Sequence, residues 1–134
     1  MKWILGTLLS LSLLTAACAD PVAPATPTPV PPNLTETFTG TLTVLGIVTY
    51  PFTVGQVGGV TVTITDMTPS AAILLGVGSQ GATGCSVIQS VTAVAGTSPQ
   101  LTGTASVAGS FCVAVSDAGN LVEPVNFTLV VRHP

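Results

Sequence analysis

The sequence predicts an all-β fold, an antiparallel β-sandwich of seven to eight short strands. Threonine and valine fill 21 and 19 of the 134 positions, and their β-branched side chains suit a pleated strand better than a helix. Apolar and polar residues alternate with a period of two in short runs. Turns that contain glycine or proline separate these runs.

The alternating runs locate the individual strands. In the run 34–44 the odd positions from 35 to 43 are threonines, while Leu34, Phe38 and Leu42 share the other face, so this strand is expected to be half-buried. The run 71–77 is apolar throughout, which is typical of a strand that is covered on both faces or lies at the centre of a sheet. Their number and spacing fit a jelly-roll or immunoglobulin-like sandwich. The runs lie at residues 34–44, 50–54, 60–65, 71–77, 85–94, 101–107, 111–115 and 127–132.

The two faces of these strands carry different side chains. The aromatic residues of the domain fall on apolar positions, which predicts core packing and argues against exposed platforms for sugars. Threonines at 35–43 and at 61–65 are expected to form outward ladders of hydroxyl and methyl groups. Such ladders keep an uncharged sheet soluble. Two other interpretations stay open: edges that pair with another protein, and a resemblance to the threonine arrays of ice-binding proteins.

The first 17 residues have the layout of an export signal. Lys2 precedes an apolar stretch at 4–14 that is too short for a membrane-spanning helix. The sequence Leu-Thr-Ala-Ala-Cys at 14–18 resembles the lipobox of bacterial lipoproteins, although a threonine stands where leucine is commonest. The resemblance implies that the signal is cut before Cys18 and that its thiol carries diacylglycerol. Two alternatives stay open. The signal is cut after the Ala-Cys-Ala pattern at 17–19, which would discard the cysteine, or Cys18 is a small residue without a role of its own.

A proline-rich tether is predicted to link this anchor to the domain. Six of the fourteen residues at 20–33 are proline, which favours an extended polyproline II segment that reaches roughly 40 Å. The predicted organisation is a signal at 1–17, a lipidated Cys18 and tether at 18–33, and a β-sandwich at 34–134. Because Ala19 follows the cysteine, the resemblance to lipoproteins favours the outer membrane of a bacterial envelope.

The remaining cysteines, Cys85 and Cys112, are expected to form a disulfide. An odd number of cysteines is unusual in an exported chain, and lipidation of Cys18 leaves one pair. Export places that pair in an oxidising compartment. Two free, buried thiols are the alternative.

The low charge excludes several kinds of function. The chain has two basic residues and a net charge of −3, so it is not expected to bind nucleic acid. His133, the one histidine, is expected to fray beside the end of the sequence and to leave the serines without a base, so no enzyme activity is predicted. No cofactor and no metal are expected.

The acidic residues are interpreted mainly as turn formers. Asp66 is expected to close a strand, and Asp117 to begin a turn that ends at Asn120. A calcium site formed by Asp117, Asn120 and Glu123 stays open as the alternative.

Several of the runs resemble bacterial pre-peptidase C-terminal domains. The resemblance rests on Phe-Thr-Gly-Thr-Leu at 38–42, Tyr-Pro-Phe-Thr-Val at 50–54, Gly-Val-Thr-Val-Thr-Ile at 59–64, and the strands at 109–117 and 127–131. It implies a jelly-roll-like accessory module of secreted enzymes, of which some relatives bind polysaccharide or collagen, sometimes with calcium. This chain has only Glu36 near the domain entrance, so the metal is not carried over.

Together these features predict a non-enzymatic, lipid-anchored envelope module that binds or organises other surface molecules. Its partners would be the membrane, through the lipid, and a protein or polysaccharide ligand. The alternatives are a glycan- or matrix-protein-binding module like the pre-peptidase domains, and an accessory domain of a separately encoded hydrolase.

Overall fold

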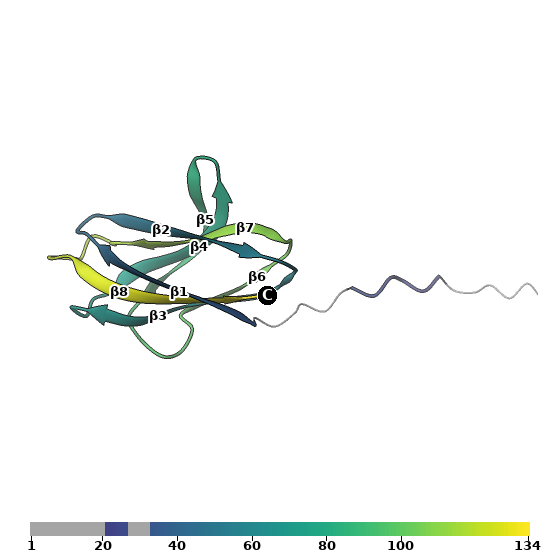
Figure 1. The fold of residues 1–134 in the computed structure, drawn as a ribbon, viewed down its shortest axis with the longest axis horizontal. Helices are drawn as coiled ribbons and strands as arrows, with labels where there is room; N and C mark the ends of the chain where they lie inside the picture. The colour runs from purple at the N-terminus through teal and green to yellow at the C-terminus, as the bar shows by residue number, and fades with distance from the viewer. Residues whose placement is uncertain (1–20, 27–32) are drawn as a thin grey trace, which may run out of the picture.

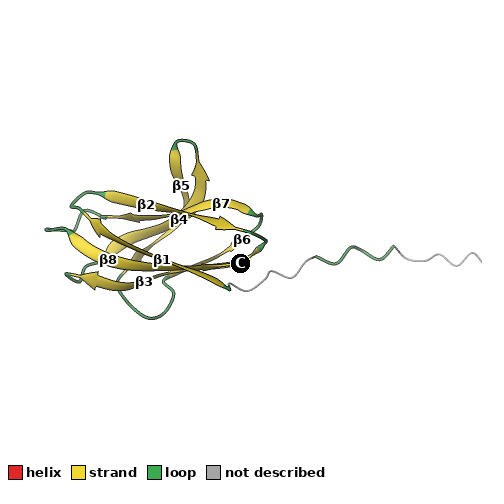
Figure 2. Cartoon of the chain, viewed as in Figure 1, coloured by secondary structure: helices red, strands yellow, loops and turns green. Residues whose placement is uncertain are grey.

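The computed structural model describes residues 21–26 and 33–134 (Figure 1). The predicted signal, Cys18 and much of the tether lie outside the described residues. Residues 21–26 are exposed and form neither helix nor strand. Figure 2 shows the described part of the chain as strands and loops. No helix in that part is long and apolar enough to cross a membrane.

The domain is an all-β sandwich of eight antiparallel strands, as the alternation predicts. One sheet has the order β1-β8-β3-β6 and the other β2-β7-β4-β5. This strand order is that of a jelly roll, which selects one of the sandwich topologies left open by the sequence. The strands are β1 (Leu34–Leu42), β2 (Ile47–Val54), β3 (Gly58–Thr68), β4 (Ile73–Gly81), β5 (Gly84–Ala93), β6 (Leu101–Ala105), β7 (Gly109–Ser116) and β8 (Val125–His133).

The core lies between the two sheets and is filled by every second side chain along each strand. Val62, Ile64 and Leu129 are fully buried, as period-two alternation requires for the inner face of a sandwich.

The aromatic residues occupy the core side, as predicted. Tyr50 stacks on Phe38 with ring centroids 4.9 Å apart, and burial raises the pKa of its phenol. Its hydroxyl donates to the Thr39 carbonyl at 3.2 Å, which joins β2 to β1 across the two sheets.

Two details of β3 differ from the sequence prediction. Asp66 does not close the strand, because β3 continues to Thr68. A bulge between Ile64 and Asp66 shifts the pairing with β8. The bulge places one additional residue, Thr65, between these paired positions, so the side-chain phase changes along the strand.

The β4–β5 hairpin covers part of the outer face of its own sheet. Gly76 and Gly78 of β4 are buried, and a Cβ atom at Gly78 would overlap the Ser86 carbonyl of β5. The pairing of β4 with β5 shifts between Val77 and Gly78, where the hairpin bends. This confirms that β4 is covered on both faces, as its apolar run predicts.

The predicted Cys85–Cys112 disulfide is present and fixes this hairpin. It joins β5 to β7 although β4 lies between them in the sheet. Strands two places apart in a flat sheet are about 10 Å apart, whereas the Cα atoms of Cys85 and Cys112 are separated by 5.7 Å. The bridge therefore requires β5 to fold over β4, and the hairpin rises from the sheet in Figure 1.

Candidate functional site

The outer face of the β1-β8-β3-β6 sheet carries the most regular arrangement of polar groups in the described domain. The registers place threonines in the same rows across the sheet, and in two places they are direct neighbours, Thr39 beside Thr128 and Thr61 beside Thr102. Same-face side chains are about 6.7 Å apart along a strand, and neighbouring strands are about 4.8 Å apart. The rows across β1, β8 and β3 are Thr35–Arg132–Thr61, Thr37–Val130–Thr63, Thr39–Thr128–Asp66 and Thr41–Asn126–Thr68. We call these residues, with Thr102 and Thr104 of β6, the threonine face.

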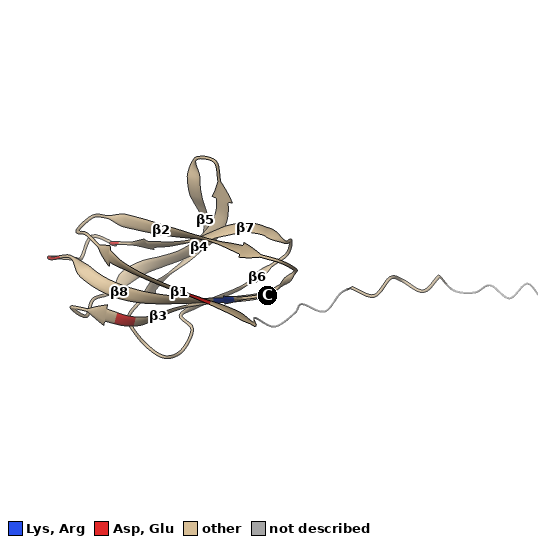
Figure 3. Cartoon of the chain, in the orientation of Figure 1, with Lys and Arg blue, Asp and Glu red and all other residues tan. Residues whose placement is uncertain are grey.

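The threonine face has very little charge. Asp66 is its one carboxylate and Arg132 its one cation, and they lie in different rows. Figure 3 shows how few charged residues the strands carry. Its chemistry is therefore that of hydroxyl and amide groups, which can both donate and accept hydrogen bonds.

A shallow hollow of about 340 Å³ lies within this face near the bulge of β3. Its rim is polar, and the hydroxyl of Thr41 donates to Asn126 Oδ1 at 2.6 Å, which fixes the orientation of that amide. The hollow is lined by Thr39, Gly40, Thr41, Asp66, Asn126, Phe127 and Thr128.

The prediction of outward threonine ladders is correct along β1 and correct only in part along β3. Thr35, Thr37 and Thr39 are exposed along the edge strand. Thr63 faces outward but is only 8% exposed, because β3 is a central strand with neighbours on both sides. Thr65 sits at the bulge, and its hydroxyl donates to the Thr128 carbonyl at 3.4 Å instead of continuing the row.

Asp117, directly after β7, holds two loops together through its carboxylate. Oδ1 accepts hydrogen bonds from the main-chain N–H groups of Gly119, Asn120 and Leu121 at 2.8, 3.0 and 3.1 Å. Oδ2 accepts one from Leu45 in the β1–β2 turn at 2.8 Å. The predicted turn is confirmed, and the bond to the β1–β2 turn was not visible in the sequence.

The geometry around Asp117 does not assemble the alternative calcium site. Both carboxylate oxygens face N–H donors, and Asn120 Nδ2 donates to the Ala72 carbonyl at 2.9 Å. Over residues 21–26 and 33–134 no three His, Cys, Asp or Glu side chains come together in a group that could hold a metal ion.

Asp117→Ala is expected to lower the Tm at pH 7, with a difference from the wild type that vanishes in acid. The N–H of Leu45 and then those of the turn hold the pKa of the Asp117 carboxyl below its ordinary value of 3.8. Because the folded-state pKa is lowered, the ionised carboxylate stabilises the fold above that ordinary value, and the contribution is lost as the pH falls through the folded-state pKa. Thermal unfolding at pH 7 and in steps below pH 4 measures this difference. Glu123→Ala, an exposed neighbour, is the control, and an equal effect of both substitutions at pH 7 would contradict the prediction.

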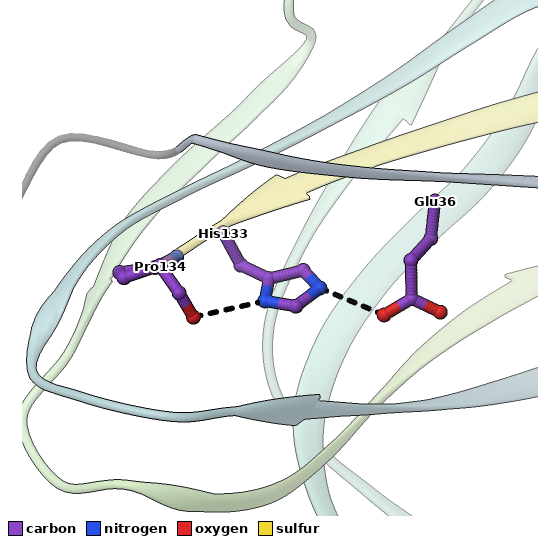
Figure 4. Close-up of polar contacts among 3 residues, drawn as sticks. All are labelled: Glu36, His133 and Pro134. Carbon is purple, nitrogen blue, oxygen red and sulfur yellow. Dashed lines mark hydrogen bonds and ion pairs between the residues drawn. The ribbon is translucent and has the colours of Figure 1, made fainter.

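His133 is not frayed, contrary to the sequence prediction. It is 1% exposed and pairs with Leu34 at the end of the β1–β8 ladder. Its ring lies against Phe52 with centroids 5.2 Å apart. Figure 4 shows its two ring nitrogens directed at Glu36 Oε1, at 2.7 Å, and at the Pro134 carbonyl, at 3.2 Å.

The sequence did contain a signal for this pair. Glu36 is in phase with Phe38, and His133 is in phase with Val131 and Leu129, so both belong to the inward face of their strands. The pair closes the end of the sandwich. The groups in contact with the His133 ring, which are Glu36, Pro134 and Phe52, include no nucleophile.

Glu36→Ala is expected to reduce the free energy of unfolding by about 1–2 kcal/mol, because it removes the partner of the buried Nε2 of His133. Urea denaturation measures this effect. Asp66→Ala removes an exposed strand carboxylate and should change the stability by less than about 0.5 kcal/mol. A Glu36→Ala protein as stable as the wild type would show that the contact contributes nothing.

Comparison with known proteins adds no assignment. No protein-family model matches the chain, and a comparison with curated proteins finds no significant match, so membership of a family is not assigned.

Proposed function

We propose that this chain is an exported, lipid-anchored envelope module that acts by contact with other surface molecules, and that the threonine face is its contact surface. The observation that carries the proposal is the register of β1, β8 and β3, which aligns threonines in rows on a sheet face that no other described element covers. The opposite sheet differs, since the β4–β5 hairpin occupies part of its outer face.

The chemistry of the face favours a neutral ligand that is rich in hydroxyl groups. One carboxylate and one guanidinium offer little attraction to a polyanion or polycation. Hydroxyl and amide groups at regular spacing can exchange hydrogen bonds with a polysaccharide, and the hollow beside Asp66 offers a shallow recess for one sugar ring. This favours the glycan-binding alternative among the functions that the sequence left open. The resemblance to pre-peptidase domains, from which that alternative came, stays a prediction.

The anchor belongs to the same proposal. Cys18 would carry the lipid, and the proline-rich segment would hold the sandwich away from an outer membrane. The exposed, irregular residues 21–26 are compatible with such a tether. Labelling with radioactive palmitate tests it: the wild type should incorporate label and Cys18→Ala should not. Equal labelling of the two proteins would refute the anchor.

The contact surface is tested separately with the full chain in detergent. Thr37→Glu and Thr128→Glu place carboxylates on the threonine face, and Thr53→Glu places one on exposed β2 of the other sheet. Co-sedimentation with insoluble peptidoglycan and with insoluble neutral glucan measures binding. We expect retention of the wild type and of Thr53→Glu on one of these polymers, and a loss of at least about tenfold for the two face variants. Equal sedimentation of all four proteins, or none, would refute the polysaccharide surface.

A further inference from the structure

Four exposed aliphatic side chains gather at the end of the sandwich away from the tether. Val44 and Leu45 lie in the β1–β2 turn, Ile47 begins β2, and Val122 lies in the β7–β8 loop. Their exposures are 42%, 79%, 65% and 92%. In Figure 1 this end lies opposite the end where the chain enters β1. We call these four residues the distal tip.

The backbone at Leu45 is unfavourable for a leucine. The turn is closed by the Gly46 N–H, which donates to the Thr43 carbonyl at 2.9 Å, so Leu45 is its second central residue. Leu45 has φ of +57°, the left-handed region that glycine or asparagine normally occupies at this position. A large apolar side chain is therefore held in water at a place where a small or polar residue would fold more readily.

Asp117 fixes this conformation from the neighbouring loop. Its carboxylate accepts the N–H groups of Leu45 and Leu121 together, and its own N–H donates to the Gly46 carbonyl at 3.0 Å. Val122 directly follows Leu121, so the same carboxylate positions the two halves of the distal tip. A strained backbone that is held by a rigid support is typical of a functional site, because the strain does not stabilise the fold.

We propose that the distal tip is a docking epitope for a second protein, one that offers an apolar pocket with a basic rim. The segments 43–47 and 117–124 contain the carboxylates of Asp117 and Glu123 and no basic residue, so charge complementarity calls for cations around the pocket. The projecting aliphatic side chains fit a concave partner, as buried anchors do at interface centres. This inference goes beyond the proposed function, since the tip is distinct from the threonine face.

The same features argue against other occupants. A lipid surface usually engages aromatic and basic side chains, and these two segments have neither. A second copy of the chain does not provide a basic rim from the described residues, in which Arg132 lies on the threonine face and His133 is buried. The occupant is therefore a different protein.

Photo-crosslinking identifies the partner in the cells that make the protein. Benzoylphenylalanine replaces Val122 in the full chain, and in a second strain it replaces Ile88, which is 77% exposed on the β5 hairpin. We expect one adduct from position 122 that is absent at position 88, with the cross-link mapping to an apolar pocket beside Lys or Arg of the partner. An adduct with a second copy, equal adducts from both positions, or no adduct would overturn the proposal.

Binding to the purified partner then separates docking from folding. Leu45→Asn should raise the Tm by about 4 °C or more, because asparagine tolerates the left-handed conformation, and it should weaken binding at least tenfold. Ile88→Asn should leave the affinity unchanged, and higher salt should weaken the wild-type complex. A Leu45→Asn protein with unchanged affinity, or Leu45-dependent flotation with phosphatidylethanolamine–phosphatidylglycerol vesicles, would overturn the assignment.

Discussion

Gly78→Ala is expected to reduce the free energy of unfolding by at least about 3 kcal/mol, because the added methyl group would overlap backbone of the facing strand. The Cβ atom would overlap the Ser86 carbonyl group and the Val87 Cα atom. Neither group is the free end of a side chain, so relief requires β5 to lift off β4. Urea denaturation followed by circular dichroism measures the change.

Gly81→Ala is the matched control for this prediction. Gly81 ends the same strand, and a Cβ atom there would lie 3.7 Å from the Gly84 carbonyl, an ordinary contact. We expect a change of less than about 0.5 kcal/mol at Gly81. Equal stabilities of the two variants would show that β5 is not pressed onto β4 in solution.

Removal of the disulfide is expected to cost about 3.5 kcal/mol, the loop-closure entropy for a sequence separation of 27. The double variant Cys85→Ala/Cys112→Ala tests this without leaving a free thiol. Its denaturation midpoint should match that of the wild type in reductant. A midpoint equal to that of the oxidised wild type would contradict the prediction.

The two effects should not add. The absence of a side chain at Gly78 and the disulfide both keep the β4–β5 hairpin against its sheet. In a chain that lacks the disulfide, the hairpin is already less tightly held, so the methyl group of Gly78→Ala costs less stability there. We expect the triple variant to lose at least about 1 kcal/mol less than the sum of the separate losses.

Features that depend only on the alternation of apolar and polar residues within one strand, or on a local turn, could be predicted from the sequence. The inward phases of Phe38 and Tyr50, the outward threonines of β1 and the turn at Asp117 each depend on neighbours in sequence. The pairing of Cys85 with Cys112 could also be predicted, because the expected export and lipidation of Cys18 leave these two cysteines as one pair.

The features that depend on contacts between distant strands were not predictable. The residues around Ile64 and Asp66 carry no sequence signal for the bulge, which arises from the pairing of β3 with β8. The strand phase of His133 indicates an inward side chain, but its burial and its contact with Glu36 need a ladder that joins residues almost a hundred positions apart. The bend of β5 over Gly78 requires both a backbone without a Cβ and a bridge to β7, and the distal tip exists because Asp117 reaches Leu45 across two loops.

The course of β1 has a mechanical consequence. This strand begins at Leu34, where the proline-rich segment ends, and two residues after it the turn reaches Val44 and Leu45. A pull between the chain's entry point and a clamped Leu45 would thus run lengthwise along one strand. Because both points lie on this one extended segment, its covalent backbone would carry the tension, and the nine paired positions with β8 would not be loaded.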